Sequence, residues 1–169
     1  MRGTIVSINT AREGGLPKRA RVGGAKLGEW GFEGDYHNRQ MRPSFSKPGT
    51  LKPNIDRHIS LVSSEVIDAL NQELGLGLMH GSLGENITTS GLGDLSQIPD
   101  GARLVIRNSI TLNELAVLRV VEQNKPCKNL YPLHRLLVKK IFGRRGILCA
   151  VESSTGHRLA RGDIIEVFL

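Results

Sequence analysis

The stretch Gly81-Ser82-Leu83-Gly84-Glu85-Asn86-Ile87-Thr88-Thr89-Ser90-Gly91-Leu92 places a short β-branched run between Gly84 and Gly91. This pattern predicts a turn that leads into a short strand over Glu85–Thr89. A second stretch, Lys125-Pro126-Cys127-Lys128-Asn129-Leu130, carries one thiol on a loop that begins near a proline. We expect the two stretches to meet in space, and the question for function is whether Cys127 is a reactive sulfur or a cysteine in a turn.

The composition indicates one soluble globular domain that spans residues 1–169. A hydrophobic content of 39% and a charged content of 23% are ordinary for such a domain, and its length suffices to bury a core without metals or disulfides. Aromatic residues make up 4% of the chain, so the core is expected to consist mainly of Leu, Ile and Val. The 20 glycines indicate many tight turns and therefore short strands rather than long helices.

The net charge of +7 predicts attraction to anions, either nucleic acid or a phosphorylated or carboxylated small molecule. Many of the basic residues lie between Arg12 and Arg57, where a solvated loop surface is the simpler explanation. Cys127 and Cys149 form no zinc-ligand pattern. The sequence shows no signal peptide and no apolar run long enough to span a membrane, so we expect free thiols in a reducing cytoplasm.

The hydrophobic pattern predicts a mainly β protein with a few helices, arranged as a β-barrel with helical decorations. One helix follows a Ser63-Ser64-Glu65 cap and ends at Gly75, and a second runs from Leu133 to Ile141. A long Pro-rich loop at about 38–56 is expected to be mobile or to cover a site. The predicted strands are Arg2–Asn9, Asp56–Val62, Glu85–Thr89, Ala102–Arg107, Ile110–Val121, Gly146–Glu152 and Ile164–Phe168, with a hairpin at Gly156–Asp163.

Cys127 is the leading candidate for chemistry. Pro126 restrains the loop, and Lys125 and Lys128 would favour a thiolate. A thiolate could bind a soft metal, carry a persulfide sulfur or attack an electrophile, and a half-buried loop cysteine is the structural alternative. Cys149 lies within an apolar strand and is expected in the core.

Six further residues keep two interpretations open. His37 and His58 could bind an anion or transfer protons, and each could equally tie down a loop. A turn at Gly84 can expose Glu85 and Asn86 beside a groove, where Asn86 could hold an amide or carbonyl of a ligand; the alternative is an Asn that hydrogen-bonds its own turn. The pair Arg144-Arg145 could clamp a phosphate or could mark the C-terminal end of the preceding helix.

Several of these stretches, taken in order, resemble the MOSC domain, named for the C-terminal domain of molybdenum cofactor sulfurases. The resemblance covers nearly the whole chain, and residues 84–92 and the later Pro126-Cys127 are its most specific parts. The matching stretches are 31–37 (GFEGDYH), 57–65 (RHISLVSSE), 84–92 (GENITTSGL), 126–127 (PC) and 162–167 (GDIIEV).

The resemblance implies a MOSC β-barrel, similar to the β-barrel domain of pyruvate kinase, in a stand-alone form. It also implies sulfur or molybdenum chemistry, with the family cysteine at Cys127 as a sulfur carrier or molybdenum ligand. Molybdenum cofactor (molybdopterin) is the implied cofactor, and pyridoxal phosphate is not expected. Residues implied to line the cofactor groove are Glu85, Asn86, Arg57, His58 and His37, with Arg145 as a basic residue for the phosphate.

Two hypotheses of function follow. In the first, Cys127 binds molybdenum cofactor or carries sulfane sulfur, as a sulfurtransferase or as a reductase of N-hydroxylated compounds. That activity needs a small-molecule substrate or sulfur acceptor, and a sulfur-donor or electron-donor protein. In the second, the chain is a non-enzymatic basic β-barrel that binds RNA or another polyanion; its one Trp, two Tyr and four Phe offer few platforms for stacking bases, which disfavours nucleic acid.

Overall fold

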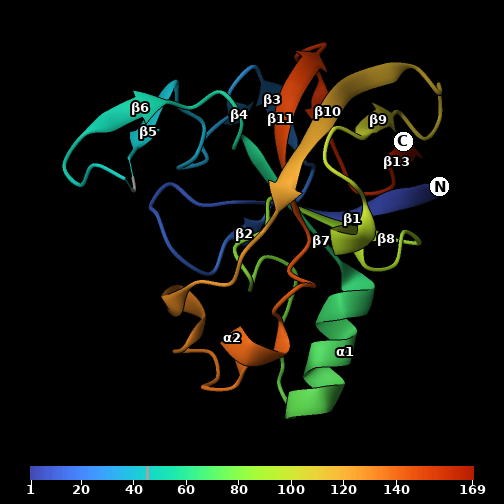
Figure 1. Ribbon diagram of the computed structural model, residues 1–169. Helices are drawn as coiled ribbons and strands as arrows, with labels where there is room; N and C mark the ends of the chain where they lie inside the picture. Colours follow the sequence, from blue (N-terminus) through green and yellow to red (C-terminus); the bar gives the residue numbers. More distant parts are fainter. Residues whose placement is uncertain (45) are drawn as a thin grey trace.

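Seven strands close into a barrel in the computed structural model, which describes residues 1–44 and 46–169 (Figure 1). The barrel order is β13-β9-β10-β11-β7-β8-β1, and pairing of β13 with β1 closes it. Strands β7 and β8 run parallel, and the other barrel pairs are antiparallel. The strands are β1 (Arg2–Thr10), β7 (Ile59–Ser63), β8 (Ile87–Ser90), β9 (Arg103–Arg107), β10 (Glu114–Gln123), β11 (Ile147–Ser154) and β13 (Ile164–Phe168). The expected mainly β barrel is therefore confirmed.

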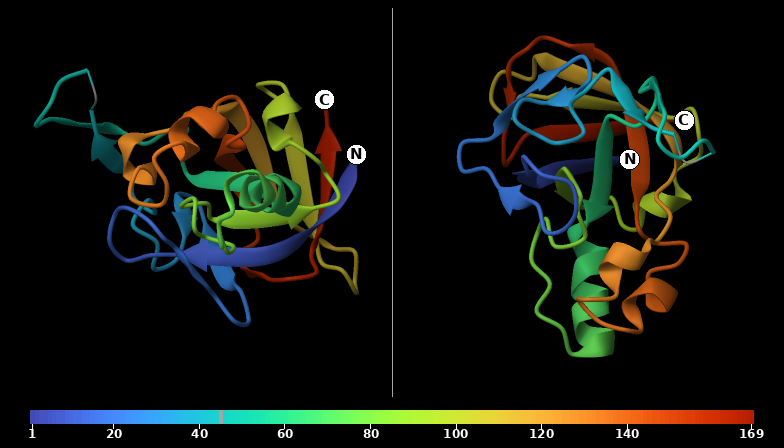
Figure 2. Two further views of the ribbon diagram at one scale, coloured as in Figure 1. Left: turned by 90° about the horizontal axis from the view of Figure 1, so that it is seen from below. Right: turned by 90° about the vertical axis from the view of Figure 1, so that its left-hand side faces the viewer.

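Short strands extend the barrel at its rim. Strand β2 (Arg19–Ala20) pairs with the end of β1, and β3 (Ala25–Gly28) pairs with β4 (Gly31–Phe32) and β12 (Arg158–Leu159). A separate hairpin joins β5 (Met41–Pro43) to β6 (Leu51–Pro53) and projects from the body of the protein (Figure 2).

The barrel interior is a single apolar core. Alternate residues of β1 point inward, as the 2-residue period of a strand requires, so that Ile5 is buried while Thr4 is exposed. Leu61, Ile87 and Ile106 are fully buried in the same cluster, together with Cys149. The expected core position of Cys149 is thus confirmed, and burial raises the pKa of its thiol far above the ordinary value.

A second, smaller core lies at one end of the barrel, beneath the two α-helices α1 (Ser64–Leu74) and α2 (Leu137–Lys140) (Figure 1). Helix α1 is confirmed as predicted: Ser63 accepts a hydrogen bond from Val66 N–H, and Gly75 ends the helix in the left-handed conformation. The buried members of this core are Val62, Val66, Ile67, Leu70, Leu83, Leu130, Leu137 and Ile141. This second core therefore connects Leu83, in the glycine-rich turn at residues 81–84, to Leu130, in the helical turn that follows Cys127.

Three sequence predictions are wrong in detail. The helix expected over Leu133–Ile141 is α-helical only as α2, because the preceding residues form single turns and no side chain caps its start. The strand expected from Ile110 begins at Glu114, since Asn108 accepts hydrogen bonds from Ile110 N–H and Thr111 N–H and holds a turn there.

The hairpin expected over Gly156–Asp163 is also not formed. Arg158 and Leu159 instead form β12, which pairs with β3. The buried side chain of Leu159 holds this segment against the barrel core. The loop expected at 38–56 likewise contains the β5–β6 hairpin, with Arg42 and Asn54 buried.

Gly146, at the start of β11, lets the chain approach β7 closely. It has φ of 77°, and a Cβ there would collide with the backbone carbonyl of Leu61. Gly156 has a similar φ of 75° but faces open space. The two glycines therefore share the same backbone strain and differ in steric room.

We predict that Gly146→Ala lowers the free energy of unfolding by about 3 kcal/mol or more, since left-handed strain of roughly 1–2 kcal/mol adds to a backbone collision. Gly156→Ala, the matched control, carries only the strain. Urea unfolding of both variants measures the difference; equal losses would contradict the steric argument.

Candidate functional site

The carboxylate of Glu85 organises the glycine-rich turn. It accepts hydrogen bonds from Gly81 N–H, Leu83 N–H (3.2 Å) and the Thr88 hydroxyl (2.9 Å), and it is completely buried. Burial raises the pKa of Glu85, and these three hydrogen bonds act in the opposite direction. The expectation that the turn exposes Glu85 beside a groove is therefore wrong, because the side chain folds back to bind its own turn.

Asn86 is also buried, and its side chain links two barrel strands. Its Oδ1 accepts from the Ser60 backbone N–H and hydroxyl, both at 3.2 Å, and its Nδ2 donates to the Asn9 carbonyl at 3.3 Å. Both ends of the carboxamide are thus used within the protein. The exposure expected for Asn86 is wrong as well, and it bridges β7 and β1 rather than binding only its own turn.

Arg145 connects the turn to the cysteine loop. One terminal nitrogen donates to the Leu83 carbonyl (2.9 Å) and the other to the Lys125 carbonyl (2.7 Å), while the side chain is almost fully buried. Its Nε is buried without a hydrogen-bond partner. Arg145 therefore bridges the two stretches that we expected to meet. Its neighbour Arg144 instead forms a bidentate ion pair with Glu73 on α1.

Cys127 stands directly before the 3₁₀ helix η2 (Lys128–Leu130). The residue is partly exposed, and its side chain makes no capping hydrogen bond to that helix. Asn129, Pro132 and Leu133 line a pocket of about 460 Å³ with Gly14, Gly15 and Leu16 on the other side. Cys127 thus lies on a loop that Arg145 holds through the Lys125 carbonyl, and the pocket is lined by residues that follow Cys127 in the chain rather than by Cys127 itself.

The two candidate histidines differ in their environment. His58 is buried: its Nδ1 accepts from Val151 N–H (3.0 Å), so its Nε2 is the atom that donates to the Asn54 carbonyl (2.7 Å). This arrangement is that of a neutral imidazole with both nitrogens occupied, which suits a role in tying down the loop. Arg57 is likewise paired, with Glu122.

His37 is exposed and belongs to a network that sequence reasoning missed. The buried Lys18 ammonium lies 2.8 Å from Asp35 Oδ2 and 3.3 Å from His37 Nδ1. Burial favours a raised pKa for Asp35, but contacts with His37 and Lys18 outweigh it and hold that pKa well below its ordinary value. Burial also lowers the pKa of Lys18. No local pattern in the sequence marks Lys18, because its partners Asp35 and Gly81 lie far from it along the chain.

The structure thus gathers the buried side chains of Glu85, Asn86, Lys18 and Arg145 around the turn at residues 81–86, and it leaves Cys127 partly exposed and His37 exposed. Within residues 1–44 and 46–169, no three His, Cys, Asp or Glu side chains cluster so as to hold a metal ion. No helix in that part of the chain is long and apolar enough to cross a membrane.

Comparison with known proteins agrees with this architecture. The MOSC domain family model matches residues 31–166. The chain belongs to the MOSC family. A relative from Bacillus subtilis (strain 168), "Putative metal-sulfur cluster biosynthesis proteins YuaD", is 30% identical over 155 residues, covering 81% of this chain and 76% of the relative.

Solved structures show the same MOSC fold. The crystal structure of the YuaD protein from Bacillus subtilis superposes with a TM-score of 0.83 at 25% identity, covering 99% of this chain and 96% of that one. YiiM from Escherichia coli superposes with a TM-score of 0.66 at 20% identity, covering all of this chain and 70% of YiiM, which supports the fold alone.

We predict that Glu85→Gln lowers the free energy of unfolding by about 1–3 kcal/mol, because the amide –NH₂ points a donor at a buried N–H donor. The control is Glu65→Gln: Glu65 accepts from Gly91 N–H at an exposed position, and its removal should cost less than about 1 kcal/mol. Thermal and urea unfolding compare the two, and a neutral Glu85→Gln would refute the organising role of this carboxylate.

We predict that Arg145→Lys costs about 2 kcal/mol, because an ammonium cannot span two carbonyls as a guanidinium fork does. Hydrogen exchange should quicken in residues 124–131, where the clamp is lost. Arg144→Lys is the adjacent control, and its solvent-screened surface pair with Glu73 should contribute much less to stability. If both variants behave alike in unfolding and exchange, Arg145 does not hold the cysteine loop.

Proposed function

We propose that this MOSC protein carries sulfane sulfur on Cys127 and passes it to an acceptor in the cytoplasm. Membership of the MOSC family supports a role related to molybdenum and sulfur, and the biosynthetic name of YuaD points in the same direction. The observation that carries the proposal is the contrast between the two cysteines. Cys127 is partly exposed on a clamped loop beside a pocket, whereas Cys149 is sealed in the barrel core.

The chemistry is an exchange of sulfur between thiols. The Cys127 thiolate attacks the outer sulfur of a donor persulfide, R–S–SH. A new S–S bond forms at Cys127 as the donor S–S bond breaks, the donor leaves as the thiolate R–S⁻, and the proton stays with the transferred sulfur. The donor is reduced to a thiol as Cys127 is oxidised to a persulfide, so that no other oxidant is needed. The same step in reverse order delivers sulfur to an acceptor thiol.

The protein's own residues supply position rather than proton transfer. Arg145 fixes the loop backbone through Lys125, and Leu130 anchors the other side of the thiol in the second core. A loop held at both ends keeps the thiol at one place, which reduces the entropy lost when a donor sulfur is brought into line.

A second candidate function, reduction of N-hydroxylated compounds with molybdenum cofactor, is favoured by the size of the pocket beside Asn129. About 460 Å³ lies within the range of small-molecule and cofactor sites. Cys127 is a soft ligand suited to the metal, and the exposed Lys125 and Lys128 could approach the phosphate. When bound, the cofactor would supply two-electron redox chemistry, with electrons from a partner protein.

The predicted cofactor-binding set fits this group only in part. Glu85, Asn86, Arg57 and His58 are each occupied by protein partners, and His37 alone is exposed. Arg57 and Arg145 each have one buried atom, Nε, without a hydrogen-bond partner, and Arg145 contacts the cysteine loop through Lys125. None of these residues lines the pocket beside Asn129, so in this candidate the metal would be held through Cys127.

We predict that the persulfide of N-acetylcysteine amide, a small donor without a carboxylate, adds one sulfur atom to Cys127. Mass spectrometry of the intact protein and of its peptides measures the addition, and molybdenum is measured on protein purified from a molybdenum-replete host. Cys127→Ser should abolish the addition and any molybdenum retention, whereas Cys149→Ala should keep both. If wild type and Cys127→Ser are alike in persulfide and in metal, Cys127 has neither role.

A further inference from the structure

Residues 124–146, which carry Cys127, form the most basic segment of the chain. They contain seven lysine and arginine residues and no aspartate or glutamate, so that this segment alone matches the +7 net charge of the whole protein. A segment of one charge sign on a folded surface generates a field that steers partners of the opposite sign.

Only three of the seven basic side chains in this segment are paired or buried within the protein. Glu73 on α1 pairs with Arg144 and, at 3.9 Å, with Lys140, and Arg145 is buried against carbonyl groups. The other four basic residues are exposed and, among the described residues, form no ion pair; they are Lys125, Lys128, Arg135 and Lys139. Their charge is therefore available to a partner.

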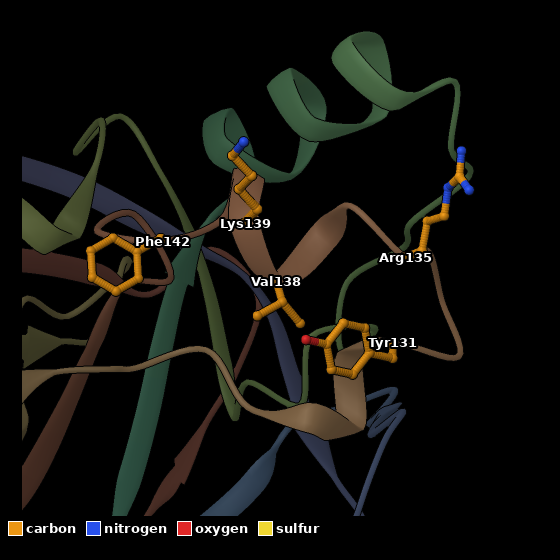
Figure 3. Close-up of a pocket in the computed structure, with 5 residues that line it drawn as sticks. All are labelled: Tyr131, Arg135, Val138, Lys139 and Phe142. Atoms are coloured by element: carbon orange, nitrogen blue, oxygen red, sulfur yellow. The ribbon is translucent and has the colours of Figure 1, made fainter.

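An open pocket of about 350 Å³ lies within the same segment (Figure 3). Tyr131 and Val138 face each other in the middle of it, with Phe142 and Arg135 on opposite sides. Phe142 is 78% exposed and Tyr131 is 56% exposed, which is unusual for aromatic side chains that have no partner. Aromatic residues and arginine around an apolar hollow are the composition of protein–protein interfaces.

The pocket lies close to the thiol along the chain. Cys127 precedes η2, and Tyr131 follows it. One turn of 3₁₀ helix separates them, which corresponds to about 8 Å at a rise of roughly 2 Å per residue. A macromolecule that fills the pocket would therefore reach Cys127.

We propose that residues 124–146 form a docking face for a sulfur-donor protein, which presents its persulfide among acidic side chains and places an apolar side chain in the Tyr131–Phe142 pocket. This inference rests on the proposed role of Cys127 as a sulfur carrier. The acidic surface complements the four unpaired basic residues, and the apolar side chain covers the exposed aromatic rings. Docking brings the donor persulfide to Cys127 for the exchange described above.

A protein partner fits this face better than RNA does. Single-stranded RNA needs several aromatic platforms along a basic groove, whereas the two aromatic residues here surround one hollow with Val138 at its centre. A hollow of this kind receives a side chain that protrudes from a partner.

The test compares two peptide persulfides of equal length, each with one phenylalanine. One carries Asp and Glu around the persulfide cysteine, and the other carries Lys and Arg. The rate of sulfur addition to Cys127 should be higher for the acidic peptide on the order of tenfold, with an advantage that shrinks as salt is raised. Arg135→Glu/Lys139→Glu should remove most of this advantage, whereas Phe142→Ser should slow the reaction of the acidic peptide by removing the apolar contact. Both variants should leave the rate with the small N-acetylcysteine amide persulfide unchanged.

A matched control reverses two exposed basic residues elsewhere on the protein, Arg2→Glu/Arg161→Glu, and should retain the preference. Equal rates for the two peptides, or no effect of reversing Arg135 and Lys139, would overturn the docking face. So would tight binding of a single-stranded RNA oligonucleotide that is lost in the Arg135→Glu/Lys139→Glu variant while the peptides show no charge preference.

Fluorescence anisotropy with the same peptides, their cysteine replaced by serine, measures docking without chemistry. Preferential binding of the acidic peptide with no sulfur transfer from any donor would retain the face and reject the sulfur-carrier role. Sulfur transfer from the small donor without preferential binding would retain the role and reject the face.

Discussion

The buried carboxylate of Glu85 is the constraint on which the rest of the site depends. A carboxylate placed in a barrel wall costs several kcal/mol unless donors surround it. Here the donors are two backbone N–H groups of its own turn and the hydroxyl of Thr88. Satisfying the carboxylate therefore fixes the path of residues 81–85, and this path sets where Leu83 enters the second core and where its carbonyl meets Arg145.

Two different interactions connect that turn to the cysteine loop and restrain the loop. The guanidinium of Arg145 is a polar bridge between carbonyl groups, and the Leu83–Leu130 cluster is an apolar one. Each would be weak alone at the edge of a barrel, but together they hold the loop from two sides. Cys127 is thereby held, partly exposed, on a backbone that has little freedom, which suits a residue that must meet a second sulfur in line.

The sequence predicted the barrel and helix α1 because both depend on local patterns: alternating apolar residues, a serine cap and a glycine stop. It did not predict that Glu85 is buried, because a turn pattern does not show whether a side chain points outward or folds back onto its own turn. It did not predict that Asn86 is buried, because its partners Ser60 and Asn9 lie on other strands. It missed Lys18 for the same reason. It also emphasised the basic residues of 12–57 over those of 124–146, since only the structure shows which charges have acidic partners.

Barrel closure joins strands from the two ends of the chain, with Arg2 opposite Glu166. Contacts between such distant residues form slowly, because the entropy of closing a long loop is lost before any pairing energy is gained. The hydrogen bonds of Glu85 span at most four residues and can form early, whereas the bond from Arg145 to Leu83 spans 62. The thiol would therefore reach its final position late in folding. In a newly made chain, the turn at residues 81–85 would form before the loop that carries Cys127 is fixed in place.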